Sequence, residues 1–200
     1  MADSAIVWSG QQDIKMGPGA TSDWLPSLGW LLLDMNGDGS TDLRFEYVID
    51  FMVQPQSGSA VVMQQVSPFV RDAMPLQGGV SIGATPADGN IWSSDADTLV
   101  DWESIPGIGL MGAGRWAFVS NAFLGVSFTA ADGIHYGWVQ ITSYPDMRAH
   151  IHSWAYESQP GVGLAAGVVP EPSTIALFIV GGLAVIFSTW RRRILARRDS

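Results

Sequence analysis

LRFEYVIDFMV, residues 43–53, alternates apolar and polar side chains along almost its whole length. The odd-numbered positions from 43 to 51 are all apolar or aromatic, and three of the four even-numbered positions between them are charged. Because successive side chains of a strand point to opposite faces of a sheet, this period predicts one half-buried β-strand over residues 43–53.

Further short runs of β-branched and aromatic residues predict more strands on both sides of this one. They cover residues 5–8, 29–35, 59–66, 115–119, 123–130, 135–142 and 149–157. Glycine, proline and Asp-Gly or Asn-Gly turns separate the runs. The spacing predicts an all-β fold, an antiparallel β-sandwich or jelly-roll-like domain over residues 1–160, with one short helix near residues 94–105.

The composition excludes several classes of function. The chain has no cysteine, so disulfides, thiol catalysis and cysteine metal sites are excluded. The net charge of −9 divides into 17 acidic and 5 basic residues in 1–170 (net −12), and 2 acidic and 5 basic residues in 171–200 (net +3). Since the acidic body would repel a phosphate backbone, we expect no nucleic-acid partner.

The stretch DMNGDGSTD, residues 34–42, is the best candidate for a binding site. Its oxygen-bearing side chains fall at alternate positions, with Gly39 sixth: Asp34, Asn36, Asp38, Ser40 and Asp42. Such a loop can turn several hard oxygen ligands toward Ca²⁺. Position 12 is Phe45 rather than Glu, so the loop is not an EF-hand, and an ordinary Asn-Gly/Asp-Gly hairpin turn remains the alternative.

Other constellations are weaker. His150 and His152 would share one side of a strand and could meet one metal ion, although two such histidines are more often solvated. Four acids in the segment 95–103 are typical of a solvated face. No nucleophile elbow, P-loop or dinucleotide fingerprint is present, so we expect no enzyme.

Eight of the nine tryptophans lie in residues 1–160. Core packing is the simpler interpretation of these large side chains. The alternative is a stacking platform for sugars. It would make the domain a carbohydrate-binding module or a polysaccharide-acting enzyme.

The C-terminal 30 residues have the pattern of a membrane segment. Residues 173–190 contain no charge, and 18 helical residues approach the thickness of a bilayer core. A basic tail, 191–200, follows, and its first arginines are Arg191, Arg192 and Arg193. Residues 161–172 are predicted as a linker, 173–190 as a transmembrane helix with its arginines in the cytoplasm, and the domain on the other side of the membrane.

The order of motifs resembles the PEP-CTERM sorting signal of Gram-negative bacteria. The resemblance rests on Val169, Pro170, Glu171, Pro172 and Ser173, then the apolar run, then the arginine cluster. It implies insertion in the inner membrane, recognition by an exosortase, cleavage near the Pro-Glu-Pro triplet, and delivery to the cell surface or extracellular matrix. Such proteins often accompany exopolysaccharide. The last predicted strands and the DMNGDG loop also resemble a recurrent domain of these proteins, one without a general biochemical activity.

The N-terminal stretch MADSAIVWSGQQDIKM has no basic region and no long apolar run, so it is not a secretory signal peptide. Proteins with this sorting signal normally begin with one. We therefore expect the natural start to lie upstream. The function expected from the whole sequence is that of an exported, non-catalytic surface or matrix protein.

Overall fold

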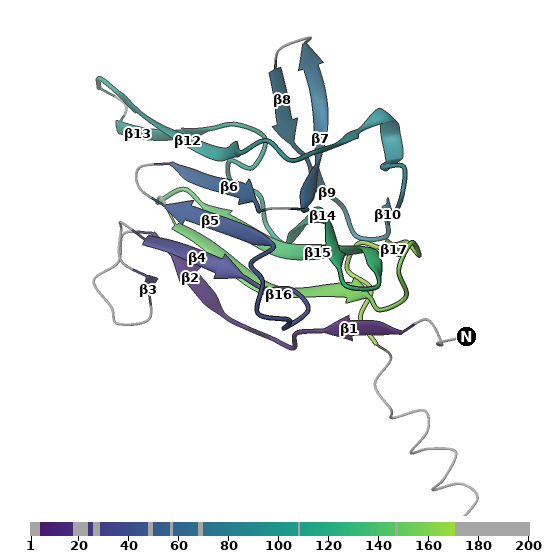
Figure 1. Cartoon of the computed structure of the whole chain (residues 1–200). Helices are drawn as coiled ribbons and strands as arrows, with labels where there is room; N and C mark the ends of the chain where they lie inside the picture. Colours follow the sequence, from purple (N-terminus) through teal and green to yellow (C-terminus); the bar gives the residue numbers. More distant parts are fainter. Residues whose placement is uncertain are drawn as a thin grey trace, which may run out of the picture. The chain divides into compact units, whose positions relative to one another are not determined.

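The computed structural model describes residues 5–17, 24–25, 29–47, 50–56, 58–67, 70–107, 109–146 and 148–170. These residues form β-strands and one 3-10 turn, Ala87–Gly89, with no α-helix among them. The chain divides into two compact units, Met1–Val169 and Pro170–Ser200. The predicted all-β, antiparallel fold class is confirmed for the described part of the first unit (Figure 1).

The larger sheet has ten strands among the described residues. Its main path runs β11 (Ile91–Ser93), β7 (Ala60–Ser67), β14 (Ala122–Ala130), β15 (Gly133–Tyr144), β16 (Arg148–Glu157), β2 (Ile14–Met16) and β3 (Trp24–Leu25). Three short strands join from the side: β8 (Val70–Ala73) on β7, β9 (Pro75–Leu76) on β14, and β1 (Ile6–Trp8) on β16. All pairs in it are antiparallel except β2 with β3.

In the described part of the chain, the second sheet has five strands, in the order β13 (Gly109–Ala113), β12 (Asp97–Ile105), β6 (Phe51–Pro55), β5 (Leu43–Tyr47) and β4 (Gly29–Leu33). A separate pair is formed by β10 (Ser81–Ile82) and β17 (Leu164–Ala165). In Figure 1, β4, β5 and β6 lie as a layer beside β15 and β16.

One hydrophobic core joins the two sheets, as in a β-sandwich. Phe45 and Val53 of the five-stranded sheet and Leu124, Val126 and Ile141 of the ten-stranded sheet are all fully buried in it. The alternation read in residues 43–53 therefore does set the inward face, since the odd-numbered positions of β5 and β6 supply the core.

A second core covers the outer face of the ten-stranded sheet, and it contains the C-terminal end of the domain. Trp138 packs there edge-on to Phe123, and Leu164 and Ala166 are buried beside them. The Ala166 amide donates to the Val80 carbonyl at 2.8 Å. Leu164 and Ala166 lie within the stretch expected to be a linker, but they pack in this core, and the chain becomes exposed from Val168.

Three local predictions are wrong. Residues 43–53 are a hairpin rather than one strand, with Tyr47 opposite Phe51, and the three residues between them preserve the inward parity. Residues 115–119 are not a strand, since 115–118 form a turn in which Phe118 has a φ of 60°. Residues 97–105 form strand β12, because pairing with β6 and β13 overrides the local helix-capping signal.

A β-bulge changes the faces of β16. Ile151 pairs with Ile141 and Ser153 with Gln140, so His152 is the extra residue. Beyond it Trp154 and Tyr156 pack against the main core, on the same side as Ile151. Because the bulge shifts the alternation, Trp154 packs on the core side of β16 although His150, four residues earlier, lies on the opposite face.

Candidate functional site

The loop between β4 and β5 holds the five predicted calcium ligands. The Asp34 carboxylate accepts hydrogen bonds from the amides of Gly37 and Gly39, both at 2.7 Å, and from Asp38 at 3.2 Å. Gly37 and Gly39 have φ values of 75° and 89°, which favour glycine. Asp34 therefore organises the turn through backbone amides.

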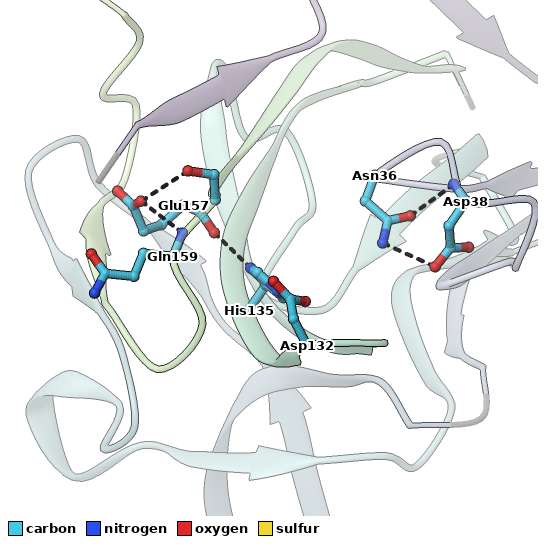
Figure 2. A network of polar contacts seen from close by, with 7 residues as sticks. Asn36, Asp38, Asp132, His135, Glu157 and Gln159 are labelled. Carbon is cyan, nitrogen blue, oxygen red and sulfur yellow. Dashed lines mark hydrogen bonds and ion pairs between the residues drawn. The ribbon is translucent and has the colours of Figure 1, made fainter. Parts of the chain in front are cut away.

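Hydrogen bonds join Asn36 and Asp38 in the middle of the loop (Figure 2). The Asp38 amide donates to Asn36 Oδ1 at 3.1 Å, and Asn36 Nδ2 donates back to Asp38 Oδ2 at 3.0 Å. The Ser40 amide donates to Asp38 Oδ1 at 2.7 Å. The hydrogen bond from the Ser40 amide, together with the one from the Asn36 side chain, holds the pKa of the exposed Asp38 carboxyl below its usual value.

Asp42 is the buried member of the loop, with 6% of its surface exposed. Its carboxylate accepts the Met35 amide at 2.8 Å. Burial, with smaller repulsions from Asp34 and Asp38, raises the pKa of Asp42 to about 6. The buried Ser59 hydroxyl opposes this rise, although it makes no hydrogen bond of ordinary geometry.

The loop fits a cation only in part. It gathers oxygen-bearing side chains of the type that Ca²⁺ prefers. Yet among the residues that the structure describes, no three His, Asp or Glu side chains lie together as a metal shell. Hydrogen bonds to Asp34 already close the turn. Calcium binding by Asp34, Asn36, Asp38, Ser40 and Asp42 stays a prediction.

A buried polar network that the sequence did not single out surrounds His135 (Figure 2). The ring is 3% exposed and stacks on Phe128. Its Nδ1 lies 2.8 Å from the Glu157 carbonyl oxygen and its Nε2 lies 2.8 Å from Asp132 Oδ1. Burial lowers the pKa of His135, but the bonds to Glu157 and Asp132 outweigh it and the net pKa is raised.

The Glu157 side chain extends this network to the chain before β1 and to the chain after β16. Its Oε1 accepts the amides of Ala5 and Gln159, each at 3.0 Å. Both nitrogens of His135 face acceptors, which a doubly protonated ring satisfies best. The network therefore fastens β1 and the segment after β16 to the sheet, and it leaves no ring nitrogen for proton transfer to a substrate.

His150 and His152 form a separate polar cluster on the outer face of β16. Their ring centroids are 3.9 Å apart. His150 Nε2 lies 2.7 Å from Asp13 Oδ1, and His152 Nε2 lies 2.8 Å from Thr142 Oγ1. Burial lowers the pKa of both rings. The two imidazoles lie side by side as expected, and their Nε2 atoms already contact a carboxylate and a hydroxyl group.

The acidic segment 95–103 does not form one site. Asp95 pairs with Arg71 at 2.6 Å, and Asp97 accepts the Ala73 amide at 2.7 Å. Burial raises the pKa of Asp97. Asp101 is exposed, and desolvation followed by the nearby Asp50 raises its pKa. These carboxylates point to different partners, so they provide no catalytic pair from within this segment.

Most of the described tryptophans pack in the protein. Trp102, Trp116 and Trp138 are buried, and Trp92 and Trp154 are half-buried. Trp8 and Trp30 are 41% and 62% exposed, and they belong to different sheets. Among the described side chains no row of coplanar tryptophans forms, so packing accounts for most of them.

The predicted sorting motif begins where the described chain ends. Val169 and Pro170 are exposed. Glu171, Pro172, Ser173, the apolar run 173–190 and the cluster Arg191, Arg192 and Arg193 lie outside the described residues. Within the described part of the chain, no helix has the length and apolar character needed to cross a bilayer. Comparison with protein-family models, curated proteins and solved structures finds no match for this chain.

Proposed function

We propose that this chain is an exported, non-catalytic surface or matrix protein that carries a C-terminal sorting and membrane-attachment signal. One observation carries the proposal. A Pro-Glu-Pro triplet, an uncharged run of 18 residues and an arginine cluster follow one another from Pro170, just after the folded unit Met1–Val169. Because this order of motifs resembles that of PEP-CTERM proteins, we infer that the chain is a substrate of an exosortase.

The domain boundary supports this arrangement. Gly167 still lies close to the second core, because a Cβ there would lie 2.7 Å from the Phe123 ring. Val168, Val169 and Pro170 are exposed. A protease that acts near the triplet would therefore reach an exposed chain and leave the cores of the domain complete.

In the precursor, residues 173–190 span the inner membrane and the arginines remain in the cytoplasm. Cleavage then delivers a jelly-roll-like domain to the cell surface or the matrix, where exopolysaccharide is the expected neighbour. A non-catalytic role is supported by His135, whose ring nitrogens are both engaged, and by the separated carboxylates of the segment 95–103.

Fractionation of a host that expresses an exosortase tests the proposal. The intact chain is expected to reach the surface in a shortened form. Replacement of Arg191, Arg192 and Arg193 by Gln is expected to leave uncleaved protein mislocalised, since the positive charges set the orientation. The matched control replaces Arg197 and Arg198 by Gln. An unchanged distribution in both variants would contradict the proposal.

A second candidate role is binding of Ca²⁺ by the loop 34–42. The observation that favours it is the buried Asp42 carboxyl, which stands near two further carboxylates of the same loop and lacks a cationic partner among the causes of its raised pKa. A cation would relieve this repulsion and stiffen the loop without taking part in catalysis. Calcium-dependent stability, described in the Discussion, tests it.

A further inference from the structure

The outer face of the five-stranded sheet carries a defined set of side chains that neither core uses. The strand registers place Trp30, Glu46, Met52 and Thr98 in one row across β4, β5, β6 and β12. Leu32, Arg44 and Gln54 form the adjacent row. The residues next to them in the sequence point into the core, so these seven side chains point outward. We call them the Trp30 surface.

Trp30 and Arg44 are held together at the β4 edge of this surface. Trp30 is 62% exposed, the largest exposed fraction among the large apolar side chains of the described chain. The Arg44 guanidinium carbon lies 5.4 Å from its ring centroid, and Arg44 Nη2 lies 2.9 Å from Glu46 Oε2. Both charged side chains are only about a third exposed, at 33% and 32%. The pair therefore fixes the indole on one side and leaves much of it open to solvent.

We propose that the Trp30 surface binds a neutral polysaccharide, with one sugar ring against the indole of Trp30. A pyranose ring has an apolar face of C–H groups and a rim of hydroxyls. The indole supplies a flat apolar partner for the face. Arg44 supplies donors and Glu46 and Gln54 supply acceptors for the rim, all within two neighbouring rows of the sheet.

The charges of the surface and of the domain select among ligand classes. Arg44 is neutralised by Glu46, so the surface has no excess positive charge for a phosphate or a uronic acid. Residues 1–170 carry a net charge of −12, which disfavours anionic chains further. An extended, uncharged chain can lie along an open sheet face without a deep pocket.

Trp8 offers a control within the same molecule. It is 41% exposed, but it lies on β1 of the other sheet, with Ala155 as its cross-strand neighbour. It therefore presents an indole without the Arg–Glu pair. The proposal does not depend on sorting of the chain, because it concerns only residues of the folded domain.

Native affinity electrophoresis of the full chain tests the proposal. The gels contain soluble dextran, galactomannan or xyloglucan, with alginate as the anionic comparison. A polyoxyethylene detergent keeps the protein in solution without adding a sugar headgroup. At least one neutral polysaccharide is expected to retard the protein. Trp30→Ala is expected to weaken that binding about tenfold, which corresponds to about 1.4 kcal/mol for the lost stacking partner.

The variants separate binding from folding. Trp8→Ala should leave the retardation unchanged, Trp30→Tyr should retain part of it, and Glu46→Gln should weaken it while preserving the shape of the side chain. Denaturant midpoints identify any variant that is merely unfolded. Three results would overturn the proposal: no retardation of the wild type in any neutral gel, retardation by alginate alone, or binding that Trp30→Ala and Trp8→Ala reduce equally.

Discussion

Substitution of Asp42 by Asn tests how the loop 34–42 is built. Asp42 is buried and its pKa is raised from an ordinary 3.8 to about 6. A carboxyl whose pKa is raised by folding contributes stability at low pH, and this contribution is lost as pH rises from about 4 to about 6. Above this pH range the ionised Asp42 carboxylate therefore lowers the free energy of unfolding of the wild type. Asn carries no charge and keeps an oxygen for the Met35 amide.

The structure gives the size of the effect. One pKa unit is worth about 1.4 kcal/mol, so the rise to about 6 costs about 3 kcal/mol once the carboxyl is ionised. In EDTA at about pH 8, Asp42→Asn should raise the free energy of unfolding by about 3 kcal/mol, and the gain should shrink to about 1 kcal/mol near pH 4.5. Denaturation of the full chain in detergent, followed by tryptophan fluorescence, measures both values. Asp38→Asn is the control, because Asp38 is exposed and its pKa is lowered.

If the loop binds calcium, the ion reverses the stability order of the wild type and Asp42→Asn. Millimolar CaCl₂ at pH 8 should then stabilise the wild type and not Asp42→Asn, since the ion compensates the buried charge. If calcium changes neither protein, the loop is a hairpin turn only. If Asp42→Asn is less stable than the wild type in EDTA at pH 8, the argument from burial is refuted.

Three further predictions concern the C-terminal part of the domain and the His135 network. His135→Gln should be less stable than the wild type below about pH 6.5, and the difference should shrink as pH rises through the raised pKa of His135. The reason is that a raised histidine pKa gives stability that is present at low pH and lost at high pH. Denaturant unfolding across this range measures the difference, and a difference that stays constant with pH would contradict the prediction. Gly167→Ala should destabilise by about 1–3 kcal/mol because the new methyl would meet Phe123 at 2.7 Å, whereas Gly161→Ala has a similar positive φ and nothing within 4 Å, so equal thermal shifts would refute the clash. A chain that ends at residue 169 should unfold cooperatively, while one that ends at residue 160 loses buried Leu164 and Ala166 and about 3 kcal/mol or more, and equal calorimetric midpoints would contradict this.

The fold class could be predicted because alternation in residues such as Leu43, Phe45 and Phe51 reports directly which side of a strand is buried. The hairpin inside residues 43–53 could not, because the number of residues between the paired Tyr47 and Phe51 leaves that parity intact. Strand β12 was not predicted, because the acidic residues at its start resemble the cap of a helix. Its structure depends on pairing with β6 and β13, which local propensity does not contain.

The candidate sites divide in the same way. The loop of Asp34 and Asp42 is local, so its spacing was visible in the sequence. The His135 network joins Asp132 with Glu157, and no motif marks contacts that depend on strand register. The packing of Leu164 and Ala166 was also missed, because small residues with glycine resemble a linker until the second core is seen.

The central claim is that a folded domain, complete by about Val169, is released near the Pro-Glu-Pro triplet. Intact-mass analysis of surface and inner-membrane fractions, from hosts with and without an exosortase, tests it most directly. The account predicts a surface species that ends within a few residues of Val169 when the exosortase is present, and a full-length, membrane-bound chain when it is absent. A full-length chain in the inner membrane of both hosts would contradict it.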